Sequence, residues 1–347
     1  MRCGDFKTTY TADMTIFESR SARIMLVLFL CVLFSLPLYT PGYLLDIINR
    51  IGIAVIGAIG LNILTGFTGQ ISLGNAAFMA IGAFSCGYLG TKFNMPFYFS
   101  IPLAGLITAS FGMFVGIPSL RIKGLYLAMA TLAAHFIVEF LIVKWESVTG
   151  GVAGLTVPTP KIGSFAIDSD ARLFVLIFVI AIMAVLFAKN LFRTKVGKAF
   201  VAIRDQAISA EVMGVNIVKY KLLSFGISSF YVGVAGALIA FQAKIISPET
   251  FPVTVAIDYL GMIIIGGLGS ILGSIYGAIF ITLLPEILRM ATTSLSGSFP
   301  ELVNKLAAMK ELVFGMLVII FLIFEPNGMA SRWHNIKNYW KLYPFSH

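Results

Sequence analysis

The sequence predicts an all-α polytopic membrane protein with about ten transmembrane helices and with its N- and C-termini in the cytosol. Two observations on the 347 residues lead to this class: 58% are hydrophobic and only 12% are charged, and the mean hydropathy is +0.93. A soluble domain carries about 25% charged residues, which it needs to cover its surface. The composition therefore excludes a soluble enzyme, a disordered regulator and a secreted disulfide scaffold.

The apolar runs give the individual helices, since a span needs about 20 mainly apolar residues. We predict spans near 24–40, 46–65, 71–91, 97–117, 124–143, 172–189, 222–242, 255–268, 271–288 and 312–325. The run 255–268 is short and fits a broken or re-entrant helix. No small-residue cleavage site follows the first run, so we expect a retained helix rather than a signal peptide. The predicted parts are a cytosolic tail (1–23), a transmembrane domain (24–325) and a second cytosolic tail (326–347).

The distribution of positive charge predicts the orientation, because lysine and arginine resist translocation. Of the 25 basic residues, 16 lie in the N-terminal tail, residues 121–123, residues 189–221 and the C-terminal tail. These segments are expected in the cytosol, and the loop 144–171 is expected outside. The net charge of +9 is therefore read as a topology signal and not as a nucleic-acid footprint.

The cytosolic segment 189–221 contains a helical pattern of its own. Its apolar positions fall on one stripe, formed by Phe200, Ile203, Ala207, Ile208 and Val212. We predict an amphipathic helix of about four turns, ended by Gly214. The pattern alone leaves two roles open: a helix resting on the membrane interface, or a docking helix for a cytosolic partner.

Glycine placement makes two further predictions. Gly269, Gly273 and Gly277 form a double G-x-x-x-G pattern, which predicts a tight packing seam between helices. A second stretch interrupts apolar sequence with small and polar residues, namely Gly66, Gly69, Gln70, Ser72, Gly74 and Asn75. Non-helical backbone in a membrane is tolerated where it is buried in protein or lines a cavity. A translocation path and a simple cytosolic turn both fit this stretch.

We predict no catalytic, cofactor-binding or metal-binding residues. The chain has no G-x-x-x-x-G-K-[ST] phosphate loop, and Cys3, Cys31 and Cys86 show neither disulfide nor metal-ligand spacing. His135 and Glu139 fall on one face of an apolar helix, where they fit a proton relay or an interfacial pair. Asp258 lies near the start of a span and is expected to cap it.

Four motifs, in order along residues 50–330, resemble the branched-chain amino acid ABC transporter permeases of the LivM type. The first is Gly60–Gly74, and the second is Thr149-Gly150-Gly151 with Gly154-Leu155. The third runs from Ala202 through Arg204 to Asn216, and the fourth is Gly266–Ser270 followed by Gly273. Two positions depart from the family pattern: Ala153 replaces a polar residue of the external loop, and Asn327 replaces a basic residue near the C-terminus.

The resemblance implies a permease subunit of the bacterial inner membrane that imports branched-chain amino acids. It implies a second related permease, two cytosolic ATPase subunits and a periplasmic binding protein as partners. It also places Arg204, Ala210, Glu211 and Gly214 in the ATPase-coupling segment and favours the docking role for its helix. Phe200, Ile203 and Ile208 are then expected to face the partner or the bundle, with Arg204 and Glu211 setting register by charge pairing.

Two other functions remain open from the sequence. A permease of the same family could carry urea or short amides, because no residue excludes these cargoes. Alternatively, an ion-coupled secondary transporter would use His135 and Glu139 as a proton relay and would work without partners. The long basic segment 189–221 argues against this second alternative, since such a carrier needs no docking helix.

Overall fold

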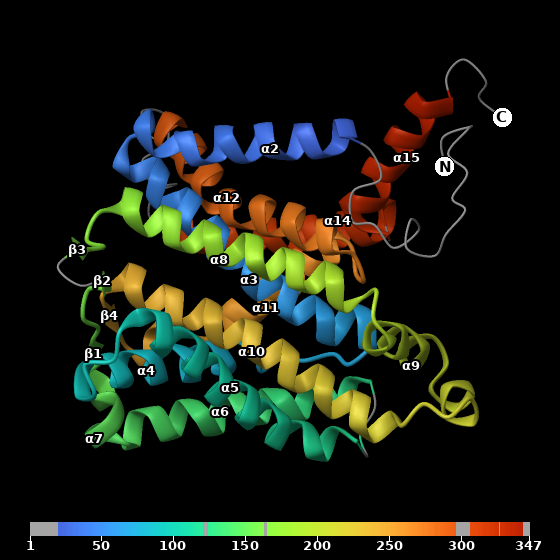
Figure 1. Ribbon diagram of the computed structural model, residues 1–347, viewed down its shortest axis with the longest axis horizontal. Coiled ribbons are helices and arrows are strands. Elements are labelled where there is room, and N and C mark those ends of the chain that lie inside the picture. Colours follow the sequence, from blue (N-terminus) through green and yellow to red (C-terminus); the bar gives the residue numbers. More distant parts are fainter. Residues whose placement is uncertain are drawn as a thin grey trace.

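A computed structural model describes residues 20–120, 122, 124–162, 165–295, 306–325 and 327–342 (Figure 1). It is a helix bundle with two small strand pairs. The long helices are α2 (Arg20–Ser35), α3 (Gly42–Thr68), α4 (Asn75–Lys92), α5 (Phe97–Ser119), α6 (Leu125–Lys144), α8 (Asp170–Leu191), α9 (Lys195–Val212), α10 (Ile217–Ala243), α11 (Val253–Gly266), α12 (Ile271–Leu295), α14 (Leu306–Phe324) and α15 (Gly328–Leu342).

The short elements lie in the connections between these helices. They are η1 (Leu36–Leu38), α7 (Glu146–Thr149), η2 (Gly151–Ala153), β1 (Leu155–Thr156), β2 (Lys161–Ile162), β3 (Phe165–Ala166), β4 (Ile245–Ile246) and η3 (Pro248–Thr250). β1 pairs antiparallel with β4, and β2 pairs antiparallel with β3. Residues 1–19 of the predicted N-terminal tail lie outside the described part of the chain.

The polytopic helical class is confirmed. Within the described residues, seven helices are long and apolar enough to cross a membrane, or up to eight if the bent pair Leu312–Phe324 and Gly328–Tyr339 forms one span. A helix also occupies each of the ten apolar runs, although α2 is short and α4 is not among these seven. The total of about ten spans and the cytosolic placement of both termini stay predictions.

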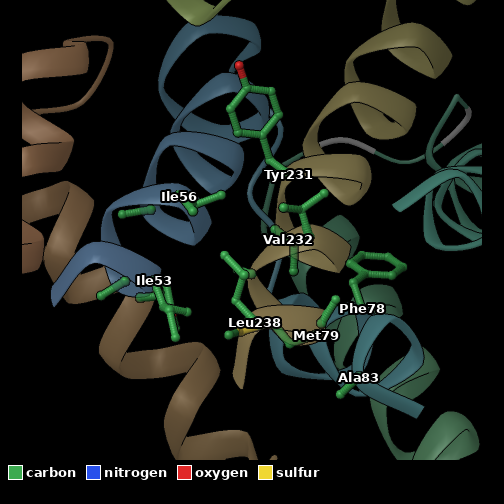
Figure 2. Close-up of a cluster of buried hydrophobic side chains, with 14 of the residues drawn as sticks. Ile53, Ile56, Phe78, Met79, Ala83, Tyr231, Val232 and Leu238 are labelled. Atoms are coloured by element: carbon green, nitrogen blue, oxygen red, sulfur yellow. The ribbon is translucent and has the colours of Figure 1, made fainter. Parts of the chain in front are cut away.

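The core forms where α3, α10 and α4 meet. Figure 2 shows Ile53 and Ile56 of α3 beside Val232 and Leu238 of α10, with Met79 of α4 below them. All five side chains are buried. Because lipid tails are as apolar as these side chains, burial alone does not hold spans together, and close packing has to do so.

Glycine provides that close packing between α10 and α4. A Cβ added to Gly236 would lie 2.0 Å from the carbonyl oxygen of Met79. One added to Gly82 would lie 2.2 Å from the carbonyl oxygen of Gly233. The two backbones therefore approach too closely for any side chain at these positions.

The bundle has two distinct ends. α9 and α15 lie at one end, and α7, β1 and β4 lie at the other (Figure 1). α10 runs the full length between them, from its start after α9 to its end before β4. This arrangement agrees with a topology in which segment 189–221 and the C-terminal helix share one side of the membrane and the loop 144–171 faces the other.

We expect Gly236→Ala to destabilise the folded protein. The added methyl group would overlap the Met79 carbonyl, and overpacking of this kind costs about 1–3 kcal/mol. Gly315→Ala in α14 is the matched control, since a Cβ there meets nothing within 4 Å. Thermal unfolding of the two purified variants in the same detergent measures the difference. Equal melting temperatures would contradict the close contact.

Candidate functional site

Three predicted segments that are far apart in sequence meet at the α9 end of the bundle. They are the last turns of α3, the middle of α9, and the turn between α11 and α12. We call their meeting point the motif junction and define it by Asn62, Gly66, Arg204, Gly269 and Ser270.

Asn62 holds the α3 side of the motif junction to the α11–α12 turn. Its Nδ2 donates to the carbonyl oxygen of Ser270 at 2.9 Å and to Oγ of Ser274 at 2.7 Å. Its Oδ1 accepts from the backbone N–H of Gly269 at 2.9 Å. The side chain is almost fully buried, and a buried amide must use both its donor and its acceptor. Asn62 therefore works as a bridge between α3 and the turn.

Small residues allow this approach. A Cβ on Gly66 would lie 2.3 Å from the backbone nitrogen of Gly269. Gly269 itself has φ +74° and lies in the turn rather than in a helix. Of the three glycines in the predicted packing seam, only Gly273 and Gly277 therefore lie in a helix and pack on a neighbouring segment. Cβ atoms added to Gly273 and Gly277 would lie 2.7 and 1.8 Å from carbonyl oxygens of Gly267 and Met262.

Arg204 joins α9 to the same place. Its Nη1 donates to the carbonyl oxygen of Gly66 at 3.0 Å, and a second guanidinium nitrogen pairs with Asp205 at 2.9 Å. Gly66 belongs to the last turn of α3, where carbonyls lack partners within the helix and carry partial negative charge. A cation is well placed there, and the hydrogen bond is charge-assisted.

The predicted path residues that follow α3 are buried rather than arranged as an exposed turn. Nε2 of Gln70 donates to Oγ of Ser224 in α10 at 2.8 Å, and the N–H of Leu73 donates to Oγ1 of Thr131 in α6 at 2.9 Å. Ser72, Gly74 and Asn75 are buried as well, whereas Gly69 is exposed beside Arg204. Gln70 Oε1 and Asn75 Nδ2 have no hydrogen-bond partner in the described part of the chain.

The amphipathic helix exists, but it is not one continuous stripe. Gln206 has φ −158° and ψ 95°, which divides α9 into two pieces. Phe200 and Ile203, before the kink, are buried against the bundle. Ile208 and Val212, after the kink, are 74% and 82% exposed. The prediction of one four-turn helix is wrong because the kink turns the second half away from the surface that buries the first.

The remaining predicted coupling residues end this second half. Ala210 is buried and its carbonyl accepts from the N–H of Val215 at 3.0 Å. Gly214 takes φ +84°, and its N–H donates to the carbonyl of Glu211 at 2.9 Å. Glu211 is exposed, and within the described residues it has no ion pair. Arg204 pairs with Asp205 within α9, and a role of Arg204 and Glu211 in setting register by charge pairing stays a prediction.

The glycine-rich loop at the opposite end is tied to two helices. Oγ1 of Thr149 donates to the carbonyl oxygen of Ile142 in α6 at 2.6 Å. Gly154 packs on the backbone of Ile246, and β1 then pairs with β4 directly after α10. The loop therefore fastens together the ends of α6 and α10 that lie away from α9.

Asp258 does not cap its helix. Pro252 occupies the N-cap of α11, and Asp258 lies in the second turn.

The structure does place His135 and Glu139 together, with Nε2 and Oε2 3.9 Å apart. No group of three or more His, Cys, Asp or Glu that could hold a metal occurs among the described residues.

Sequence reasoning missed Asn62 as a functional residue. The available signal was a single amide in the otherwise apolar run that precedes Gly66. A polar side chain at such a depth needs a partner, but no sequence pattern selects one that lies more than 200 residues away.

A family model described as "branched-chain amino acid transport system / permease component" matches residues 43–322. The high-affinity branched-chain amino acid permease protein LivM of Salmonella typhimurium is 27% identical over 331 residues, covering 88% of this chain and 74% of that protein. A probable LivH of Methanocaldococcus jannaschii is 24% identical over 295 residues, covering 82% of this chain and 90% of that protein. The autoinducer 2 import permease LsrC of Escherichia coli is 22% identical over 253 residues, covering 69% and 68%. No solved structure matches the chain.

We expect Asn62→Ala to destabilise the protein by about 1–3 kcal/mol, because it removes the hydrogen-bond partner of the Gly269 N–H. Asn335→Ala removes the same amide from an exposed position of α15 and should change little. Thermal unfolding in detergent compares the two variants. A melting temperature for Asn62→Ala equal to that of the control would show that the bridge does not stabilise the junction.

Proposed function

The chain belongs to the branched-chain amino acid transport permease family, and from this premise we propose that it is the membrane-spanning subunit of an ATP-driven importer. The proposed cargo is branched-chain, hydrophobic amino acids, carried from the periplasm to the cytosol across a bacterial inner membrane. Its proposed partners are a second related permease, two cytosolic ATPase subunits and a periplasmic binding protein. The ATPases would supply the nucleotide chemistry, for which the sequence has no phosphate loop.

The observation that carries this proposal is the shape of α9. Its first half is anchored in the bundle through Phe200 and Ile203. Its second half leaves Ile208 and Val212 exposed, and Met213, directly after the helix, is exposed as well. Exposed apolar side chains beside a basic segment are typical of a surface that a protein partner covers. We assign this face to an ATPase subunit.

Arg204 supplies the connection from that face into the membrane. It lies two residues before the kink and donates to Gly66, which is packed against Gly269. A push on the second half of α9 would therefore reach two broken membrane segments at once: residues 69–74 and the α11–α12 turn. We propose that ATP binding moves α9 as a lever and that the helices respond by alternating access.

Residues 66–75 are the proposed translocation path. A leucine-like cargo needs an apolar route with a few polar groups for its ammonium and carboxylate. The free Gln70 Oε1 and Asn75 Nδ2 atoms would provide polar groups in this buried stretch. Urea or short amides remain the second candidate cargo, and one relative is named for the import of autoinducer 2, so the family does not fix the cargo.

We expect Ile208→Asp to prevent the ATPase subunits from binding, since it places a charge in the centre of the exposed apolar face. The measurement is co-purification of the ATPases with the tagged chain from membranes. Val152→Asp is the matched control, because Val152 is 71% exposed and lies in η2, between α7 and β1 and away from α9. Retention of both ATPases by Ile208→Asp would overturn the docking assignment.

Arg204→Ala should separate binding from coupling. Because Arg204 contacts the membrane segments and not the exposed apolar face, the ATPases should still co-purify, while amino acid uptake per ATP hydrolysed falls several-fold. Lys198→Ala removes an exposed cation from the same helix and serves as the control. Proteoliposomes containing the whole importer, loaded with ATP and supplied with binding protein, measure both rates. Full coupling in Arg204→Ala would contradict the lever.

The same proteoliposomes decide between the functions. Saturable uptake of leucine, isoleucine or valine that needs ATP supports the proposal. Uptake of urea alone would select the second cargo class. Uptake by this chain without partners, driven by a proton gradient, would show that the chain is a secondary transporter and not a subunit of an ATP-driven importer.

A further inference from the structure

A small cavity lies between α6, α4 and η3, and the motif junction does not include it. Its walls include Ala77 and Ala80 of α4, Pro248 of η3, Phe251 directly after η3, and His135 and Glu139 of α6. Its volume is about 10 Å³, which is room for about one water molecule. An amino acid does not fit there, so this site is separate from the proposed path.

His135 is the unusual group in this cavity. Its side chain is only 1% exposed, and neither ring nitrogen has a hydrogen-bond partner in the described part of the chain. Buried polar groups are nearly always paired, and an unpaired one calls for an explanation such as a bound water or ion. Two unmet nitrogens on one buried ring, facing a water-sized space, point to a ligand of that size.

Glu139 gives the cavity a charge and an opening. Its Oε2 lies 3.9 Å from Nε2 of His135, one helical turn further out, and its side chain is 46% exposed. Among the residues that line the cavity, these two are the titratable ones. α4 contributes only apolar side chains, and the carboxylate of η3, Glu249, is exposed beside Pro248.

We propose that this cavity is a proton-binding site, with His135 as the acceptor and Glu139 as both its counter-ion and its contact with outside water. A proton from the outer compartment passes along the Glu139 carboxylate and bonds to Nε2 of the neutral imidazole. The product is an imidazolium facing a carboxylate, a pair with no net charge. Imidazole is suited to this because its charge changes within the physiological pH range.

Proton binding at this site would act on the outer end of the bundle. The imidazolium attracts the Glu139 carboxylate one turn along the same helix, which stiffens the outer half of α6 beside the cavity wall formed by Pro248 of η3. That half of α6 is bound to the glycine-rich loop through Thr149 and Ile142, and η3 directly follows β4, which pairs with β1 of the same loop. External acidity would therefore tighten this end of the molecule.

Ring-¹⁵N-labelled histidine in the full chain, in nanodiscs, tests the site, because the sequence contains three histidines. Between about pH 5 and 8, the resonance assigned to His135 should change reversibly from the neutral to the protonated form. It should be missing from His135→Gln and present in His334→Gln, whose histidine is exposed on α15. A His135 resonance that stays unchanged over this range overturns the proposal.

Hydrogen exchange tests the consequence with an independent readout. On acidification, the amides of the outer half of α6 should become at least several-fold better protected relative to those of α10. Glu139→Gln and His135→Gln should both remove this change, and His334→Gln should keep it. Persistence of the change in Glu139→Gln would refute the paired site. Neither measurement involves transport, so they stand or fall independently of the proposed function.

Discussion

The bridge made by Asn62 is the interaction on which the α9 end of the molecule depends. In a membrane, backbone groups that leave a helix must find partners within the protein, because lipid offers none. The turn between α11 and α12 leaves such a group at the N–H of Gly269, which donates to the Asn62 amide oxygen, and the amide nitrogen of Asn62 adds a hydrogen bond to the Ser270 carbonyl. With that turn fixed against α3, the end of α3 is also fixed, and Arg204 has a defined carbonyl to bind.

This constraint also accounts for the position of the glycines. Gly66 lies one helical turn after Asn62, and a Cβ added there would lie 2.3 Å from the backbone nitrogen of Gly269. Gly277 lies where α12 crosses the backbone of α11. At Gly277 the packed partner is backbone, and at Gly66 it is the Gly269 backbone together with the Asn62 amide that is bonded to it. Neither can move aside as a flexible side chain can. Glycine is required there by contact, and not by local helix preference, which would disfavour it.

Much of the helix order could be predicted from the sequence, because each span leaves a continuous apolar run. The two breaks after α3 and between α11 and α12 were also visible as small and polar residues. The kink at Gln206 was not, because its sequence keeps a regular helical stripe across the bend. Nor was the junction itself, since pairing Asn62 with Ser270 is a tertiary choice made across 208 residues. The pattern locates the breaks but does not say which of them touch.

The motif junction and the α6–η3 cavity differ in whether their buried polar side chains have hydrogen-bond partners. At the motif junction, the amide nitrogen and the amide oxygen of Asn62 both have hydrogen-bond partners in the protein. This full pairing holds α3 and the α11–α12 turn in one arrangement, as the proposed lever requires. At the α6–η3 cavity, both nitrogens of His135 are left open, at a cost that a purely structural packing site would avoid by using an apolar side chain. Full pairing favours rigidity, whereas unmet hydrogen bonds favour exchange with a ligand. The paired Asn62 bridge therefore suits the lever proposed for α9, and the unpaired ring of His135 suits the proton site proposed at the α6–η3 cavity.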